Sequence, residues 1–272
     1  MRFADPPRLH LPVEIHAERQ LLFASDFHLG APDAQTSRNR EKRIVAWMES
    51  WEAQTAALFL MGDVFDFWHE YRHVVPKGFV RILGKLAEWV DAGIPVHLFT
   101  GNHDLWMYGY LEQEIGLTIH RHPRQLWACG KRFYLAHGDG LGPGDHGYKL
   151  IKRIFTNRWC QWLFRQVHPD RGIGWARYFS QTSRKKTGHA DAQFLGADRE
   201  WLILHAQDVL RQIFYDYFIF GHRHYPITWP LKDPQGNSSC YVNLGDWIRY
   251  FSYAAFDGAH LSLKYHEMHS LA

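Results

Sequence analysis

The stretch ALFLMGDVFD at residues 57–66 decides the fold of this chain. Five apolar residues are followed at once by Gly62 and Asp63, which is typical of a buried strand that ends in a loop. Four other stretches repeat the pattern: LLFASDFH at 21–28, PVHLFTGNHD at 95–104, FYLAHGD at 133–139 and YFIFGHRH at 217–224. We therefore predict five strands, each followed at its carboxyl end by Asp, His or Asn.

Segments with helical periodicity separate some of these strands. Apolar residues recur at helical spacing from Arg43 to Trp51 and from Phe79 to Val90. The alternation predicts an α/β fold with a largely parallel sheet, in which ligands bind outside the carboxyl ends of the strands. After His224 the runs CYVNLGDW, YFSYAAF and HLSLKYH leave no room for long helices, so we expect a second sheet that packs back as hairpins.

An insert interrupts the alternation at about residues 141–210. The loop LGPGDHG opens it, and the apolar stripe between Tyr148 and Val167 predicts helices. Residues 145–190 hold ten Lys or Arg against two Asp, in a chain whose net charge is only +3. Such a segment suits phosphate groups, nucleic acid or an anionic membrane surface, or is the solvated face of a helix. We expect a single domain, residues 1–272, with this insert as a helical lid.

The composition excludes several classes of protein. A chain of 272 residues with 46% hydrophobic residues can bury a full core. Cys129, Cys160 and Cys240 form no C-x-x-C pair, so we predict neither a disulfide framework nor a thiolate zinc site. No stretch reaches the ~18 apolar residues that a membrane span needs, and the N-terminal residues lack a secretory-leader pattern. We therefore expect a cytoplasmic protein.

The side chains at the strand ends are candidate metal ligands: Asp26, His28, Asp63, Asn102, His137, His222 and His224. Residues at alternate positions share a face, so Asp26 and His28 can turn toward one point. Asp63 offers two oxygens that can bridge cations ~3.5–4 Å apart. Nitrogen and oxygen donors without thiolate suit Mn²⁺, Fe or Zn²⁺. We predict two divalent metal ions, Mn²⁺ foremost, which lower the pKa of a bridging water and so supply hydroxide at neutral pH.

Two further residues are candidates for the catalysis itself. His103 follows Asn102 directly and is surplus to the ligands, so it can stabilise the transition state or protonate the leaving oxygen. Asp66 could orient the other ring nitrogen of His103. Taken singly, each motif has a structural explanation, since Asp-x-His is usually a cap or surface pair and Gly-Asp a turn. Five motifs in this order, each after a strand, favour a catalytic site.

The motifs D-x-H, GDxxD, GNHD, a lone His-Gly and GHxH resemble those of the calcineurin-like metallophosphoesterase superfamily, and they span Asp26 to His224. The resemblance implies a four-layer α-β-β-α sandwich of two mixed sheets. It implies one metal on Asp26, His28, Asp63 and His224, and the other on Asp63, Asn102, His137 and His222. It also implies that His103 is the catalytic acid and that Asp66 supports it.

Finer features resemble the UDP-2,3-diacylglucosamine diphosphatases of lipid A synthesis. The motifs that carry this resemblance are SD-x-HL at Ser25–Leu29, GD-x-F-x-x-W at Gly62–Trp68, HGD at His137–Asp139 and the pair Gly147-Tyr148. The resemblance implies a hydrolase that cleaves UDP-2,3-diacylglucosamine to UMP and 2,3-diacylglucosamine 1-phosphate. It departs at one position, because members of the best-known branch carry Arg after the metal-ligand Asn, where this chain has His103.

A basic, aromatic lid suits that substrate. The candidates for binding the pyrophosphate are Tyr148, Lys149, Ser183, Arg184 and Lys186. The aromatic residues Trp159, Trp162, Phe164 and Trp175 either line a slot for acyl chains or form the core of the insert itself. We expect peripheral association with the anionic cytoplasmic face of the inner membrane, and no nucleic-acid partner.

Other functions could use the same metal site. A nuclease or cyclic-nucleotide phosphodiesterase would track a backbone with the basic insert. A protein phosphatase would need an open groove, which a helical lid disfavours. A non-catalytic scaffold predicts eroded ligands, whereas this sequence retains every ligand of the pattern.

Overall fold

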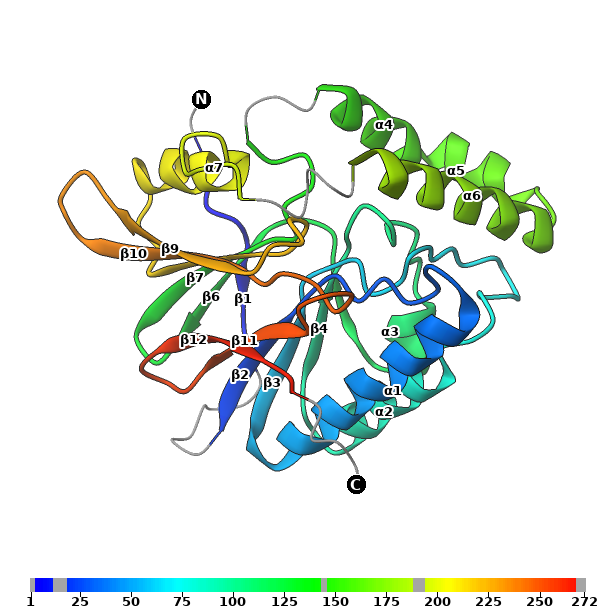
Figure 1. The fold of residues 1–272 in the computed structure, drawn as a ribbon, viewed down its shortest axis with the longest axis horizontal. Helices are drawn as coiled ribbons and strands as arrows, with labels where there is room; N and C mark the ends of the chain where they lie inside the picture. The colour runs from blue at the N-terminus through cyan, green and yellow to red at the C-terminus, as the bar shows by residue number, and fades with distance from the viewer. Residues whose placement is uncertain (1–2, 12–18, 143–145, 188–193, 268–272) are drawn as a thin grey trace.

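Two six-stranded sheets face each other in the computed structural model, and helices cover the outer face of each sheet (Figure 1). The structure describes residues 3–11, 19–142, 146–187 and 194–267. The first sheet contains, in order across it, β12 (Leu261–Tyr265), β11 (Ser252–Phe256), β2 (Gln20–Ala24), β3 (Thr55–Leu60), β4 (Val96–Phe99) and β5 (Thr118–His120). The second contains β1 (Arg8–Leu9), β6 (Arg124–Ala128), β7 (Lys131–Leu135), β8 (Tyr217–Phe220), β10 (Ser238–Asn243) and β9 (Ile227–Lys232).

Helices complete the outer layers. α1 (Ala34–Trp51) and α2 (Val80–Asp91) cover the first sheet, and α7 (Trp201–Leu210) covers the second (Figure 1). α1 begins where the Asp33 carboxylate accepts the backbone N–H groups of Gln35 and Thr36, each at 2.9 Å. The short helices η1 (Glu52–Gln54) and α3 (Tyr110–Glu114) lie in connections. The predicted four-layer α-β-β-α sandwich is confirmed.

The core between the two sheets is aromatic. Phe23 of β2 stacks on Phe59 of β3 with ring centroids 4.9 Å apart, and on Phe133 of β7 at 6.1 Å. All three side chains are fully buried. Stacked aromatic rings contribute beyond the area that they bury, so this layer fixes the two sheets against each other. The strand ends of both sheets therefore meet at one rim.

The five strands predicted from the site motifs are present as β2, β3, β4, β7 and β8. The strands after His224 form two antiparallel hairpins, as predicted, but the prediction that they make a sheet of their own is wrong. β9 and β10 extend the second sheet, with β10 parallel to β8, whereas β11 and β12 extend the first, with β11 antiparallel to β2. Their short apolar runs could pair with either open edge, and local sequence does not decide which.

Three helices occupy most of the predicted insert, and we refer to them together as the lid: α4 (His146–Thr156), α5 (Arg158–Arg165) and α6 (Pro169–Thr187). They lie together above the sandwich, apart from the helices that cover the sheets (Figure 1). The side chain of Asn157 accepts the N–H groups of Trp159 and Cys160, which separates α4 from α5. α7 falls inside the predicted insert but packs on the second sheet with Leu202, Ile203 and Val209 buried.

Candidate functional site

The structure brings all seven predicted donors to the rim where the strands end. They follow β2, β3 and β4 of the first sheet and β7 and β8 of the second. Asp26, His28, Asp63 and His222 have positive φ angles of 56°, 43°, 52° and 66°. Non-glycine residues seldom adopt this conformation, and such strain concentrates at functional sites. The backbone turns sharply after each strand and points these side chains inward.

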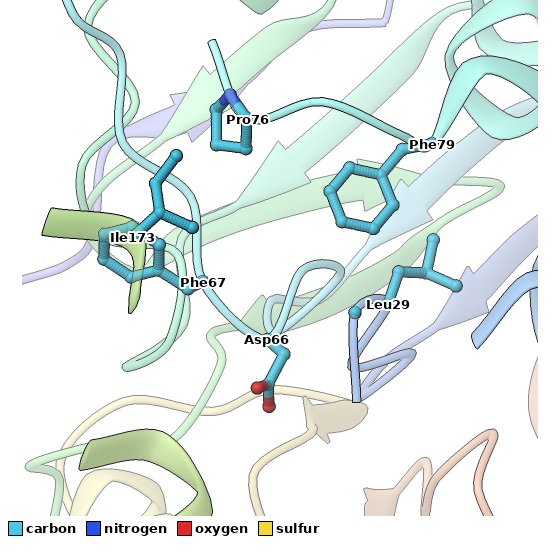
Figure 2. A pocket seen from close by; sticks show the side chains of 7 residues that line it. Leu29, Asp66, Phe67, Pro76, Phe79 and Ile173 are labelled. Atoms are coloured by element: carbon cyan, nitrogen blue, oxygen red, sulfur yellow. The ribbon is translucent and has the colours of Figure 1, made fainter. Parts of the chain in front are cut away.

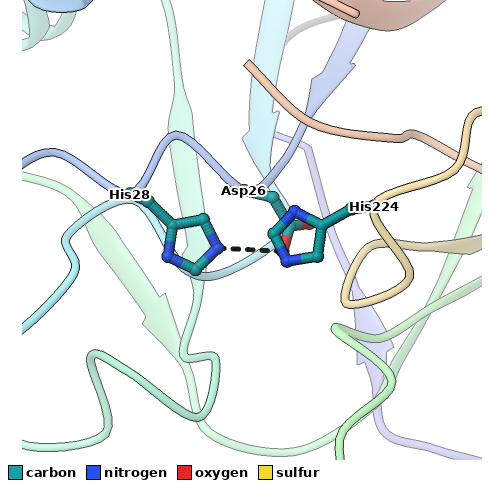
Figure 3. A group of neighbouring side chains, drawn as sticks. All are labelled: Asp26, His28 and His224. Atoms are coloured by element: carbon teal, nitrogen blue, oxygen red, sulfur yellow. Dashed lines mark ion pairs between the residues drawn. The ribbon is translucent and has the colours of Figure 1, made fainter. Parts of the chain in front are cut away.

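Asp26, His28 and His224 form the first donor group (Figure 3). Asp26 Oδ1 lies 3.6 Å from His28 Nε2 and 3.8 Å from His224 Nε2. These separations are too long for hydrogen bonds but short enough for the atoms to share one cation, since metal–ligand bonds to His and Asp measure ~2.0–2.2 Å.

Asp63 lies between this group and a second one. Its Oδ2 atom is 3.8 Å from His28 Nε2 and 3.4 Å from His137 Nε2. The second group adds Asn102, whose Oδ1 atom lies 3.3 Å from His137 Nε2 and 3.0 Å from His222 Nδ1. The carboxylate of Asp63 thus faces both donor groups.

The residues fit divalent metal ions. Asp26 and His28 are fully buried, and within the described residues Asp26 Oδ1 and His28 Nε2 have no hydrogen-bond partner. Buried polar atoms without partners are costly, so their convergence indicates a group that would satisfy them. His137 Nδ1 donates to the carbonyl of Met61 at 2.7 Å, which turns its Nε2 atom toward Asp63. We conclude that this rim is a divalent-metal site.

The charges of the site favour anionic carboxylates. Burial raises the pKa of Asp63, but the charge of the neighbouring His137 outweighs burial and holds that pKa well below its ordinary value. Burial also opposes ionisation of Asp26, and its contacts with His28 and His224 lower its pKa nonetheless. Both carboxylates are therefore ionised at neutral pH, as metal ligands must be.

Two glycines of the motifs leave space for the donors. A Cβ atom on Gly101 would overlap the carboxylate of Asp63, and one on Gly221 would overlap Ser25 and lie 2.7 Å from Asp26 Oδ2. The glycines of GNHD and GHRH are therefore required by close approach of the backbone to the donors.

His103 and Asp66 lie beside the first donor group. His103 Nδ1 is 3.1 Å from the backbone carbonyl of Asp66 and 3.8 Å from its Oδ1 atom. The backbone carbonyl of Asp66 thus faces this ring nitrogen of His103, and the carboxylate lies slightly farther from it. That carboxylate faces His28, with Oδ1 3.5 Å from His28 Nδ1. Burial lowers the pKa of His103 to about 4, so the ring is neutral at neutral pH.

Sequence reasoning assigned no role to two buried aspartates. Asp246 Oδ2 lies 3.1 Å from His224 Nδ1, and it orients that ring. Asp104 accepts the N–H groups of Gly101 at 2.7 Å and Val64 at 2.9 Å, which ties two site loops together. Burial raises the pKa of Asp104 to about 7, and the charge of Asp63 adds to the shift. The signal for Asp246 was present, because LGDW repeats the pattern of an apolar strand followed by Gly-Asp.

The predicted substrate-binding residues lie on α4 and α6. Lys149 is half-buried, and its Nζ atom donates to the carbonyl of Gly142 at 2.8 Å. The side chains of Tyr148, Ser183, Arg184 and Lys186 lie outside what the structure describes. Trp159, Trp162 and Trp175 are exposed by 76%, 54% and 56%, so they do not form a core of the insert. Phe164 packs on the body instead, with its ring 4.7 Å from that of Trp106.

A cavity of about 700 Å³ lies beside His137, under α4. Its basic lining comes from Arg121, Lys149, Lys152 and Arg153, and its apolar lining includes Phe99, Leu105, Met107 and Leu141. Lys152 Nζ is 2.5 Å from Asp139 Oδ2, which anchors α4 next to the site. A site of this size suits a small molecule with an anionic part. The two-sheet sandwich, the donor groups and this cavity together are those of a divalent-metal hydrolase, as the resemblance of the motifs to calcineurin-like metallophosphoesterases implies.

Comparisons with known proteins refine the assignment. A relative from Porphyromonas gingivalis named UDP-2,3-diacylglucosamine hydrolase is 39% identical over 257 residues, which cover 90% of this chain and 97% of the relative. The chain belongs to the UDP-2,3-diacylglucosamine hydrolase family. A relative of the same name from Aeromonas hydrophila is 26% identical over 229 residues, which cover 84% of this chain and 90% of the relative.

No protein-family model matches the sequence. A solved dimetal phosphatase from Danio rerio is similar over 92% of this chain and 99% of its own, at 14% identity and a TM-score of 0.40. This structural likeness is too weak to support an inference. The family assignment therefore rests on the sequence relatives, and the site chemistry on the donor groups.

Proposed function

We propose that this chain hydrolyses the pyrophosphate bond of UDP-2,3-diacylglucosamine, releasing UMP and 2,3-diacylglucosamine 1-phosphate. Water supplies the new oxygen on one phosphorus, and the other phosphate leaves with the bridging oxygen. The observation that carries the proposal is the shared carboxylate of Asp63 between two donor groups, 3.8 Å from His28 Nε2 and 3.4 Å from His137 Nε2. The name of the Porphyromonas gingivalis relative supplies the substrate.

The proposed site holds two divalent cations, with Mn²⁺ as the first choice. Asp26, His28, Asp63 and His224 would hold one, and Asp63, Asn102, His137 and His222 the other. Cations bound there would polarise the phosphoryl oxygens and lower the pKa of a bound water. A donor set of imidazole nitrogens and carboxylate or amide oxygens suits Mn²⁺, Fe and Zn²⁺. Metal analysis of protein purified without added metal distinguishes among them.

His103 is the proposed proton carrier. Its Nδ1 atom faces the Asp66 carbonyl, which only accepts hydrogen bonds, so Nδ1 carries the proton of the neutral ring. Nε2 is then free to exchange a proton with the leaving oxygen. Burial lowers the pKa of His103 to about 4, and the negative charge of a bound pyrophosphate beside the ring would raise it. The substrate itself thus promotes protonation of the group that releases its product.

The lid is the proposed substrate cover. Lys149 and Arg153 line the 700 Å³ cavity beside His137 and would meet the pyrophosphate. Tyr148, Ser183, Arg184 and Lys186 extend this proposal along α4 and α6. A cavity of that volume can hold a UDP-sugar, but two long acyl chains must extend beyond it. The exposed aromatic residues of α5 and α6 offer an apolar surface for those chains.

We further propose that the lid contacts an anionic membrane. Trp159 and Leu163 of α5 and Trp175 and Phe179 of α6 are exposed by 56–76%, and Arg158 beside them is exposed. Amphipathic helices with aromatic and basic residues bind at the membrane interface. Among the helices in the described residues, none is both long and apolar enough to cross a membrane.

Flotation with anionic vesicles tests the membrane contact. We expect wild-type protein to float and Trp159→Ser with Trp175→Ser to stay behind. Trp127→Ser is the matched control, because Trp127 is 46% exposed on β6, away from the lid. Equal flotation of all three proteins, or none by the wild type, would refute the lid as the membrane contact.

A substrate panel tests the proposed reaction. Initial rates are compared for UDP-2,3-diacylglucosamine, bis-p-nitrophenyl phosphate, a cyclic nucleotide and single-stranded DNA. We expect UMP release from the lipid to exceed hydrolysis of each other substrate by at least a hundredfold. Hydrolysis of DNA or the cyclic nucleotide at the highest rate would instead identify a nuclease or phosphodiesterase.

A further inference from the structure

A serine of the lid reaches the catalytic side of the site. Ser180 of α6 is half-buried, and its Oγ atom lies 3.0 Å from Asp66 Oδ2 and 3.2 Å from His103 Nδ1. The three residues lie far apart in the sequence, so the folded lid creates these contacts. The lid therefore supplies a polar group to the residues around the proposed proton carrier.

The hydrogen-bond directions give Ser180 a defined role. His103 Nδ1 carries its proton because the Asp66 carbonyl at 3.1 Å can only accept. The hydroxyl of Ser180 can accept from that same N–H while its own proton goes to Asp66 Oδ2, because a hydroxyl is donor and acceptor at once. Ser180 thereby links the two residues, and it holds the Asp66 carboxylate whose other oxygen faces His28.

The packing of the lid places Ser180. Ile173 of α6 and Phe67, next to Asp66, line the same cavity of about 10 Å³, which has room for about one water (Figure 2). Gly172 lies so close to the Tyr71 hydroxyl and the Phe164 ring that a Cβ atom would meet them. Trp106 Nε1 donates to the carbonyl of Phe155 in α4 at 2.7 Å. A docked lid thus fixes the distance between α6 and the Asp66 loop.

We propose that Ser180 is a positioning residue of this enzyme, which orients His103 and Asp66 only when the lid is docked. The proposal rests on the role proposed above for His103. Full activity then requires a docked lid, because movement of α6 away from the body would remove one hydrogen-bond partner of the His103 Nδ1–H group. Ser180 acts through its two neighbours and needs no contact with substrate.

The test compares Ser180→Ala and Ser180→Thr in Mn²⁺-loaded full-length protein. We expect Ser180→Ala to lower kcat about tenfold with KM within twofold, since one hydrogen bond to a catalytic group is lost. Ser180→Thr retains the hydroxyl and should recover most of kcat. Ser50→Ala is the matched control, because Ser50 is a helix serine whose hydroxyl bonds to the Trp47 carbonyl in α1.

A spectroscopic readout separates positioning from packing. In Zn²⁺-loaded protein, the Nδ1–H proton of His103 should exchange with water faster in Ser180→Ala than in wild type, and at the wild-type rate in Ser180→Thr. Wild-type kcat in Ser180→Ala, a change in KM alone, or no rescue by threonine would each overturn the proposal. If the wild-type protein cleaves bis-p-nitrophenyl phosphate but not the lipid, the proposed substrate is refuted. The role of Ser180 is then tested by kcat on the diester. If the wild type cleaves neither substrate, the proton-exchange rates of His103 alone decide whether Ser180 positions the ring.

Discussion

The Nδ1 atom of His224 lies 3.1 Å from Oδ2 of Asp246. Asp246 stands in the turn after β10, and its other oxygen accepts the N–H groups of Ile248 and Arg249 at 3.1 and 2.7 Å. A carboxylate so fixed holds the proton of His224 on Nδ1, and the Nε2 lone pair faces Asp26. Such partners commonly set the tautomer and the basicity of a metal-binding histidine.

Asp246→Asn should therefore weaken metal binding without unfolding the protein. We expect about 10–100-fold lower affinity for Mn²⁺ at the site that includes His224, as seen when comparable partners are removed elsewhere. Titration calorimetry on chelator-treated protein measures it. Asp233→Asn is the control, because Asp233 likewise accepts backbone N–H groups in a turn but lies between β9 and β10. Equal affinities in both variants would contradict the role of Asp246.

Gly101→Ala should lower the activity strongly, although Gly101 is not itself a proposed metal ligand. The added methyl group would overlap the Asp63 carboxylate, so either the carboxylate or the loop must move. A displacement of about 1 Å is enough to cost about a hundredfold in rate. Gly84→Ala in α2 is the control, since a Cβ atom there meets nothing within 4 Å and alanine favours the helix. Steady-state kinetics and metal content check both variants, and normal kinetics in Gly101→Ala would count against the geometry.

Arg40 supports the loop that carries His28. Its buried Nη1 atom donates to the carbonyls of Phe27 at 3.1 Å, His28 at 2.9 Å and Ala31 at 3.1 Å. Arg40→Met leaves these acceptors short of a partner, which should lower the free energy of unfolding by about 1–3 kcal/mol. Denaturant unfolding measures the loss. Arg38→Met alters an exposed position of the same helix and should change little. Equal stability of the two variants would refute this role.

Stability should fall in acid because of two buried histidines. His97 and His120 lie with Nδ1 of one 3.1 Å from Nε2 of the other, and burial lowers their pKa values to about 4 and about 3. Between about pH 6.5 and 4 the unfolded chain binds protons that the folded chain does not, so the free energy of unfolding decreases as pH falls through that window.

His97→Gln should reduce that pH dependence. We expect a smaller difference between urea midpoints at pH 7.5 and pH 5 than in wild type, with chelator present in both so that metal release plays no part. His10→Gln replaces an exposed histidine and should leave the difference unchanged. A difference in His97→Gln as large as in wild type would show that this pair is not responsible.

The donors at the strand ends could be predicted because an apolar run followed directly by polar or glycine residues indicates both a buried strand and the position of its carboxyl end. Asp26, Asp63 and Asn102 were found in this way. The sequence could not give the positive φ angles of Asp26 and Asp63, because these depend on the packing of several loops. Nor could it place Ser180, since one serine in a helical insert carries no signal of the loop on which it docks. The sheet joined by β11 likewise depends on which edge is open.

The most direct test of two-metal hydrolysis measures UMP release from UDP-2,3-diacylglucosamine while chelator-treated protein is titrated with Mn²⁺. We expect no release without metal, full activity at two Mn²⁺ per chain, and at least a thousandfold loss in Asp63→Asn at saturating Mn²⁺, since Asp63 is the carboxylate that faces both donor groups. Metal-independent UMP release, or full activity in Asp63→Asn, would contradict the proposed two-metal hydrolysis.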